Sequence, residues 1–195
     1  MTRNRTSARR ATPCRGGALR FLRRRDGVSA VEFALLAPVL ITMLLGLTEV
    51  GRYIYLRLKI VNIASNVSEV IARAEVVRAT ELDSLFSAMP VMLRPFEAGG
   101  RFAVVVTGVV IPAAGDPATV AWQRTGGGLT VASAVGAPGG EADVPADLAI
   151  PGGEAVVVAE VFYDYEAWLL GFAASQQVRE TAFARPRRSA LGAME

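Results

Sequence analysis

Apolar and polar residues divide the chain into three zones. A polar head covers residues 1–26, an apolar run follows from Val28 to Thr48, and mixed patterns fill the remainder. Glu32 is the single charged residue of the apolar run. A helix of this length would measure about 30 Å, which is the thickness of a bilayer core. The pattern therefore predicts a transmembrane helix over residues 28–50.

Beyond the apolar run, the hydrophobic period remains helical. Apolar residues recur at alternating spacings of four and three, at Leu56, Ile60, Ile63, Val67, Val70, Ala74 and Val77. Polar and charged side chains occupy the other faces, a pattern typical of an amphipathic helix. The stripe is short for a coiled coil, which favours packing on a sheet or on neighbouring helices. We expect one helix from Val28 to Ala88, ending before Pro90, in which residues 51–89 extend the membrane segment.

After Pro95 the period changes from helical to extended. Segments rich in β-branched or alternating residues predict strands at 102–111, 119–124, 154–165 and, as an edge strand, 178–185. The glycines at 126–128 are expected to break the second strand, residues 133–153 to form a long surface loop, and residues 167–174 to form a short apolar helix or turn. The fold class is therefore α+β: a long N-terminal helix packed on a small antiparallel sheet, with a β-rich domain over residues 90–195.

Charge divides the chain at the start of the apolar run. Residues 1–26 hold nine arginines and one acid, a net charge of +8, whereas the whole chain carries +3 and the remainder therefore −5. A basic head on an acidic body argues against a nucleic-acid-binding fold, although a basic arm alone would still attract nucleic acid non-specifically. Arginine on one flank predicts a cytoplasmic N-terminus, so residues after about Gly51 are expected outside the membrane. We predict membrane lipid, and no nucleic acid, as a partner.

The residue inventory excludes the commonest catalytic and metal sites. The chain has no histidine and one cysteine, Cys14, which lies in the basic head. Ser-His-Asp and Cys-His catalysis are therefore ruled out, and zinc or copper sites of the usual kind are not expected. Acids at 141, 143 and 147 lack the spacing of a calcium loop. We predict no enzymatic activity, no cofactor and no metal.

Four acidic residues outside the apolar run are expected to be exposed to solvent. Glu49 follows the run directly, and we expect it to be a solvated interfacial acid, with pairing to Arg52 as the alternative. Glu160, Asp164 and Glu166 fall on one side of the third predicted strand. Outward, solvated positions on that strand account for these three acids.

The sharpest signal lies where the basic head meets the apolar run, in the sequence RDGVSAVEF at residues 25–33. A basic leader ends in Gly27, the hydrophobic segment begins at once, and an acid and an aromatic residue stand at Glu32 and Phe33. This arrangement resembles the type IV prepilin signal, which a dedicated peptidase cuts after the glycine. A secretory signal would instead lose its apolar stretch on cleavage. The resemblance implies removal of residues 1–27 and a mature chain that begins at Val28.

The resemblance also implies a role for Glu32 and its neighbour Phe33. A charge inside a membrane helix is expensive and is usually paired. In pilins the partner is the new N-terminal amine of an adjacent subunit, and such a pairing would set the register of a helical filament. The alternative that the residues leave open is an acid at the membrane edge, solvated by headgroups.

Residues 27–52 are similar to the N-terminal region of TadE-like minor pseudopilins of the tight-adherence (Tad, type IVb) pilus. The matching features are Glu32-Phe33, Ala34-Leu35, Pro38, and Gly46 with Glu49 and Gly51. Segments 121–124, 158–165 and 185–187 also look similar to TadE-like chains. The resemblance implies a pilin-like fold and a role in pilus assembly. It further implies a single-pass protein of the bacterial inner membrane with its C-terminal domain in the periplasm.

The partners that this resemblance implies are a prepilin peptidase, other pilins and minor pseudopilins, and an inner-membrane assembly platform. Whether the chain enters the fibre or acts only at its base stays open. The rival interpretation is a bitopic envelope protein that is never cleaved and whose sheet binds a soluble ligand or protein. The two interpretations differ on whether Gly27 and Glu32 are replaceable.

Overall fold

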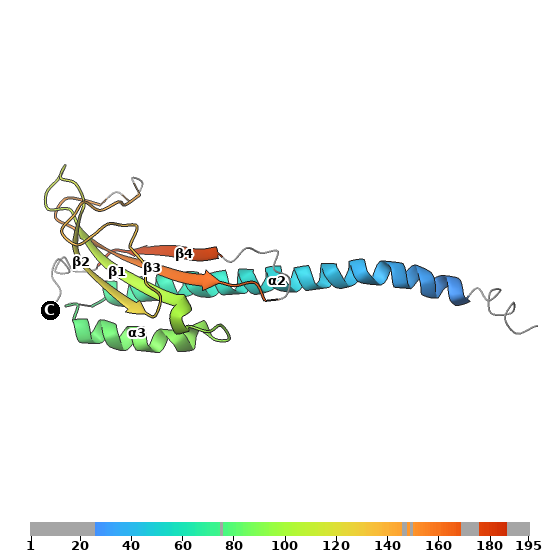
Figure 1. Ribbon diagram of the computed structural model, residues 1–195. Helices are drawn as coiled ribbons and strands as arrows, with labels where there is room; N and C mark the ends of the chain where they lie inside the picture. Colours follow the sequence, from blue (N-terminus) through green and yellow to red (C-terminus); the bar gives the residue numbers. More distant parts are fainter. Residues whose placement is uncertain (1–25, 75, 146–147, 149, 169–175, 187–195) are drawn as a thin grey trace, which may run out of the picture. The chain divides into compact units, whose positions relative to one another are not determined.

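The computed structural model describes residues 26–74, 76–145, 148, 150–168 and 176–186, and the chain forms two compact units, Met1–Leu45 and Gly46–Glu195. Helix α2 (Asp26–Ala72) supplies every described residue of the first unit and continues into the second. The second unit adds helix α3 (Ala79–Leu93), a 3₁₀ turn η1 (Gly99–Arg101) and four strands (Figure 1). Cys14 and nearly all of the predicted leader lie outside the described residues, as does most of segment 167–174.

The four strands form one antiparallel sheet in the order β2-β1-β3-β4. Their bounds are Phe102–Val110 for β1, Thr119–Gly127 for β2, Ala155–Tyr165 for β3 and Gln176–Ala184 for β4. Each predicted strand is present, within three residues at either end, and β4 is an edge strand as expected. Runs of β-branched residues and alternation therefore located the sheet correctly. The α+β class predicted from the sequence is confirmed.

Strand β2 ends at Gly127, within the glycines at 126–128 that were predicted to break it, and so extends beyond its predicted end at Arg124. Gly126 pairs with Val104 of β1 and lies against Phe86 of α3. A Cβ atom at Gly126 would stand 2.3 Å from Cδ2 of Phe86. Glycine at position 126 therefore allows α3 to approach the strand closely, which is a known reason for a glycine inside a strand.

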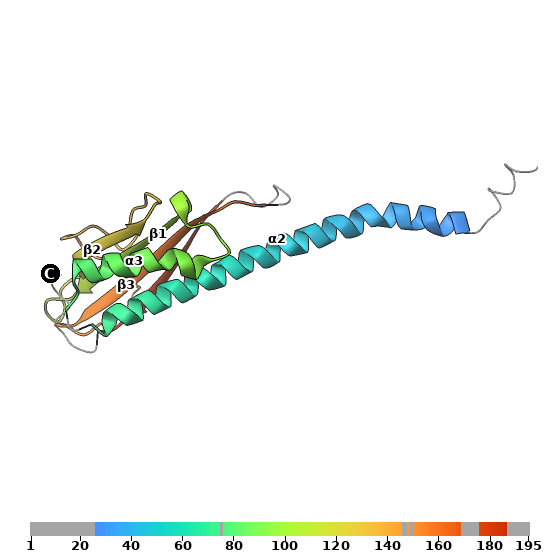
Figure 2. The same ribbon diagram turned by 90° about the horizontal axis from the view of Figure 1, so that it is seen from below.

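One face of the sheet is covered by α3 and by the part of α2 that belongs to the second unit (Figure 2). The predicted stripe is buried at its start, with Leu56 and Ile60 both fully buried. Further along, Val70 is 55% exposed and Ile71 takes its place at 4%. The shift follows from helix geometry, because a straight helix drifts by about 20° per heptad relative to a 3.5-residue repeat.

The single helix expected from Val28 to Ala88 is wrong. Helix α2 ends at Ala72, and α3 begins after Arg78, so residues 51–89 are not one extension of the membrane segment. The apolar stripe of α3 is buried at Leu82, Phe86, Met89 and Leu93. A continuous rod would carry this stripe past the sheet, whereas the interruption between Ala72 and Ala79 lets α3 cover β2. Burial of each large apolar side chain is worth about 1.5–3 kcal/mol, so tertiary packing prevails over helix continuity.

Pro90 does not end α3, which continues to Leu93. A proline inside a helix costs about 3 kcal/mol through the lost hydrogen bond and the ring clash. Met89 and Leu93 on either side of it are fully buried, and their packing offsets this cost. Asp83 of α3 also forms a bidentate ion pair with Arg124 of β2, in which Arg124 Nη2 lies 2.7 Å from Asp83 Oδ2.

The second face of the sheet is covered by the connection between β2 and β3, which was expected to be a surface loop. Its buried and half-buried apolar residues form two small clusters on the strands. The members from the connection are Leu129, Val131, Val135, Ala142, Val144, Leu148 and Ile150. Strands β1 and β3 are therefore buried on both faces, which explains their nearly continuous apolar sequences.

Glu160 on β3 is fully buried, so its predicted solvent-exposed position is wrong. Its carboxylate accepts hydrogen bonds from the Ser133 hydroxyl and from the Ala134 backbone N–H at 3.1 Å. Arg179 on β4 forms an ion pair with it at 2.9 Å. The carboxylate thus ties the β2–β3 connection to the sheet. Glu166 is exposed as expected.

Candidate functional site

The N-terminal part of α2 presents apolar side chains to solvent on every side. Its candidate membrane span, in the helix Gly27–Ala72, has a mean hydropathy of 2.2 in its most apolar window, and none of that window is buried. Representative side chains are Leu35 at 72% exposure and Met43 at 71%. A surface of this kind is stable in lipid and unfavourable in water. Among the described residues, this is the one helix long and apolar enough to cross a membrane.

Gly27 and Val28 lie in the first turn of α2. No atom comes within 4 Å of the position that a Cβ on Gly27 would occupy, and Val28 is 59% exposed. The first four N–H groups of a helix have no partner inside the helix, and terminal turns fray. The Gly27–Val28 peptide bond therefore lies at an accessible end of the helix rather than inside packed structure.

Glu32 and Phe33 follow one turn later, and both side chains are exposed. Glu32 has neither a hydrogen bond nor an ion pair within the part of the chain that the structure describes. It therefore places one carboxylate on an otherwise apolar helix surface. The four residues predicted from the sequence, Gly27, Val28, Glu32 and Phe33, thus share the first two turns of α2.

A second polar position, Glu49, differs from its predicted solvated state. Glu49 is 6% exposed and accepts a hydrogen bond from the Tyr165 hydroxyl at the end of β3. The backbone N–H of Trp168 lies 3.2 Å from each of its carboxylate oxygens. Glu49 therefore fastens α2 to the end of the sheet. Helical spacing was the available signal, because Glu49 precedes the buried Leu56 by seven residues and so shares its face.

The environment of Tyr165 changes its acidity. Burial, the hydrogen bond to Glu49 and the negative charge of Glu49 raise the pKa of Tyr165 to about 12, against an opposing effect of Arg52. The ring also packs edge-on against Tyr53 of α2, with centroids 5.2 Å apart. In the contact between β3 and α2, the neutral Tyr165 hydroxyl therefore donates a hydrogen bond to the Glu49 carboxylate.

The stability of the protein at alkaline pH is expected to depend on the hydrogen bond between Tyr165 and Glu49. A tyrosine with a pKa raised above its usual value near 10 contributes stability that is complete below pH 10 and is lost as the pH rises through about 12. Tyr165→Phe should remove most of this decline and cost about 1.5–3 kcal/mol at neutral pH, because a hydrogen bond to a charged group is lost. Tyr163, whose pKa burial also raises, would leave a smaller residual slope.

The measurement is the thermal midpoint of the full chain in detergent between pH 8 and pH 12. Tyr55→Phe is the matched control, since Tyr55 lies on the same helix as Glu49 and is 48% exposed. Equal alkaline slopes for the wild-type chain and Tyr165→Phe would contradict this interpretation.

No group of three or more metal-ligating side chains lies close together in the described ranges. Asp147, one of the acids considered for calcium, lies outside the described residues. What the described residues offer is therefore an apolar helix surface, one exposed acid near its start, and a small α+β body.

These features define a class: an α+β protein with a long apolar N-terminal helix, the one candidate membrane span among the described residues, packed on a small antiparallel sheet. Residues 27–68 match the family model of the TadE-like protein, which confirms the predicted resemblance over that segment. The match begins at Gly27, includes Glu32 and Glu49, and stops before the sheet. It is consistent with a membrane protein associated with Tad pili. No curated protein and no solved structure matches the chain.

Proposed function

We propose that this chain is a non-catalytic minor pseudopilin that takes part in the assembly of a Tad-type pilus. A prepilin peptidase removes residues 1–27 on the cytoplasmic side, and the mature chain begins at Val28. The apolar run then holds the protein in the bacterial inner membrane, with the β-rich body in the periplasm. The strongest support is the family match that begins at Gly27, combined with an exposed Glu32 that lacks a partner among the described residues.

The exposed apolar surface supports membrane insertion. Covering a large apolar side chain is worth about 1.5–3 kcal/mol, and most side chains between Val28 and Leu47 are of this kind. Lipid, or the apolar helices of other pilins, would supply this cover. Pro38 is compatible with either, because Thr42 donates a hydrogen bond to the Pro38 carbonyl at 2.8 Å and membrane helices tolerate proline.

Glu32 supports a specific partner. An acid at the centre of a membrane helix costs about 2.5–3.5 kcal/mol, and less near an end. An ammonium group at about 4 Å would return about 4 kcal/mol at an effective dielectric constant of 20. Cleavage before Val28 creates such a group on every processed subunit. Pairing Glu32 of one subunit with the Val28 amine of the next would fix their axial register, as a head-to-tail assembly requires.

Removing the Glu32 carboxylate should separate processing from assembly. A Glu32→Ala chain is expected to be cleaved as fully as the wild-type chain, because its glycine and leader are intact. The yield of sheared fibres should fall at least about tenfold, which corresponds to a loss of about 1.4 kcal/mol per pairing. The readouts are the intact mass of the membrane-extracted protein and the amount of pilin in the sheared fraction.

Glu69→Ala is the matched control, because Glu69 is an exposed acid on the same helix whose pair with Arg73 is at the surface. It should leave both readouts unchanged. Fibre yield at the wild-type level in cells that carry only Glu32→Ala would contradict the proposed pairing.

A further inference from the structure

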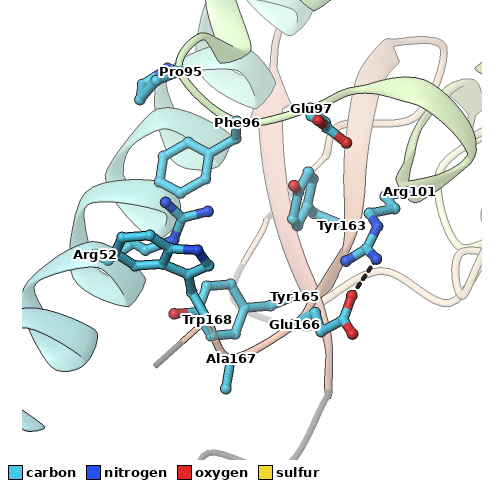
Figure 3. Close-up of a pocket in the computed structure, with 10 residues that line it drawn as sticks. All are labelled: Arg52, Pro95, Phe96, Glu97, Arg101, Tyr163, Tyr165, Glu166, Ala167 and Trp168. Atoms are coloured by element: carbon cyan, nitrogen blue, oxygen red, sulfur yellow. Dashed lines mark hydrogen bonds and ion pairs between the residues drawn. The ribbon is translucent and has the colours of Figure 1, made fainter. Parts of the chain in front are cut away.

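A polar cavity lies in the second unit, where α2 meets the end of β3 and the segment before η1 (Figure 3). Its volume is about 470 Å³, which lies within the usual range for small-ligand sites. Two arginines, two glutamates and several aromatic rings line it. Neither the TadE-like match nor the proposed pairing at Glu32 accounts for this group of side chains.

One side of the cavity is cationic. The Arg52 guanidinium lies between two aromatic rings, with its Cζ 5.0 Å from the Phe96 centroid and 5.7 Å from the Trp168 centroid (Figure 3). The Arg52 Nε is shielded from solvent and has no hydrogen-bond partner in the described chain. A planar guanidinium held between aromatic rings is suited to a phosphate oxygen.

The other side carries more negative than positive charge. Arg101 pairs with Glu166, and both side chains are largely exposed, so this pair is weak and able to exchange partners. Glu97 also lines the cavity, on the same side as Arg101, and makes no ion pair of its own in the described residues (Figure 3). Tyr163 stands between the two sides and offers a ring face, which attracts ammonium groups. The cavity therefore has a cationic and an acidic end.

The location of Arg52 indicates the source of a ligand. Arg52 follows Thr48, the last residue of the apolar run, by four positions on the same helix, or about 6 Å of helical rise. Trp168 at the cavity edge is 70% exposed, and tryptophan is typical of the headgroup level of a membrane. These two observations, the closeness of Arg52 to the end of the apolar run and the exposed Trp168, support lipid headgroups as the source of a ligand.

We infer that this cavity binds the headgroup of a zwitterionic phospholipid that carries a phosphodiester and a primary amine, such as phosphatidylethanolamine. The phosphate contacts Arg52, and the ammonium group lies toward Glu97 and Glu166. A purely anionic headgroup would satisfy Arg52 but place its remaining polar groups against carboxylates. The inference rests on the membrane span of the proposed function, and not on leader cleavage or assembly.

The test is native mass spectrometry of the full chain released from nanodiscs of equimolar phosphatidylethanolamine and phosphatidylglycerol. We expect phosphatidylethanolamine to be retained at least about threefold over phosphatidylglycerol. Arg52→Gln should lower that retention several-fold, whereas Arg73→Gln, a change at an exposed arginine directly after the end of α2, should not change it. Glu97→Gln should keep lipid bound and shift the preference toward phosphatidylglycerol, since the ammonium loses its carboxylate. Thermal melts of all variants check folding.

Equal retention of the two lipids, or no effect of Arg52→Gln, would overturn the inference. In a second experiment, soluble glycerophosphoethanolamine is added to lipid-free protein in detergent. If it raises the thermal midpoint of the wild-type chain but not of Arg52→Gln, and no phospholipid is retained from nanodiscs, the ligand is a soluble molecule rather than a membrane lipid. A chain that does not enter nanodiscs at all would instead contradict the membrane span. Failure of the headgroup site is therefore distinguishable from failure of the proposed function.

Discussion

A Gly27→Ala chain is expected to keep its leader in cells that process the wild-type chain completely. The peptidase must bind an unwound backbone at the Gly27–Val28 bond, and glycine favours the unwound state. Alanine is about 1 kcal/mol more helix-stabilising, and its methyl group enters the space next to the bond to be cut. We expect a near-complete block, visible as an intact mass that still includes residues 1–27.

The fold itself tolerates this substitution, which makes the result easy to interpret. No atom lies within 4 Å of the added Cβ at Gly27, so loss of cleavage would reflect recognition by the peptidase rather than misfolding. Gly51→Ala is the matched control, because Gly51 lies in the same helix and is equally free of neighbours. It should be processed normally. Complete processing of Gly27→Ala would mean that this glycine is not the cleavage signal.

A Glu160→Gln chain is expected to lose about 2–3 kcal/mol of stability. The carboxylate is fully buried and receives the Ser133 hydroxyl, the Ala134 N–H and the Arg179 guanidinium. An amide has a single acceptor oxygen and no charge, so the ion pair with Arg179 is lost and the three donors must share one oxygen. In a unit of this size, the loss corresponds to a fall in thermal midpoint of roughly 5–12 °C.

The same change should release the β2–β3 connection from the sheet. Limited proteolysis is expected to cut the Glu160→Gln chain between residues 128 and 153 at protease levels that leave the wild-type chain intact. Glu154→Gln provides the control, since Glu154 is an exposed acid just before β3. A thermal midpoint within 1–2 °C of the wild-type value would show that the buried carboxylate contributes little, as happens when water replaces lost partners.

The features predicted correctly from the sequence are those that depend on local patterns. The apolar run after Asp26, the start of the amphipathic stripe at Leu56 and the four strands each have a period that the chain carries by itself. The TadE-like resemblance rested on similarly local residues between Gly27 and Arg52, and the family match falls on this segment.

The features predicted wrongly depend on contacts between distant segments. The sequence between the end of α2 and the start of α3 has no glycine or proline, and burial of the apolar stripe of α3 favours the helix break there. Glu49 and Glu160 look like surface acids until Tyr165 is placed beside the first, and the Ser133 hydroxyl and the Ala134 N–H beside the second. A carboxylate is stable in the interior only when hydrogen-bond donors from other parts of the chain contact it, and no local sequence pattern predicts those contacts.

The β2–β3 connection illustrates the same limit. Its glycines, prolines and alanines are typical of a surface loop, yet Val135 and Ala142 are buried against the sheet. Isolated apolar residues spread over a long loop have no period, so the sequence does not reveal that they share one face. These residues pack on the second face of the sheet because β1 and β3 are apolar on both sides and that face has to be covered.

The central claim is that Val28 becomes the N-terminus of the mature protein. The most direct measurement is the intact mass and N-terminal sequence of the membrane-extracted chain, produced with and without a co-expressed prepilin peptidase. The account predicts a start at Val28 that depends on the peptidase and a full-length chain without it. An intact N-terminus in both samples would contradict the pseudopilin proposal and favour an uncleaved, signal-anchored envelope protein.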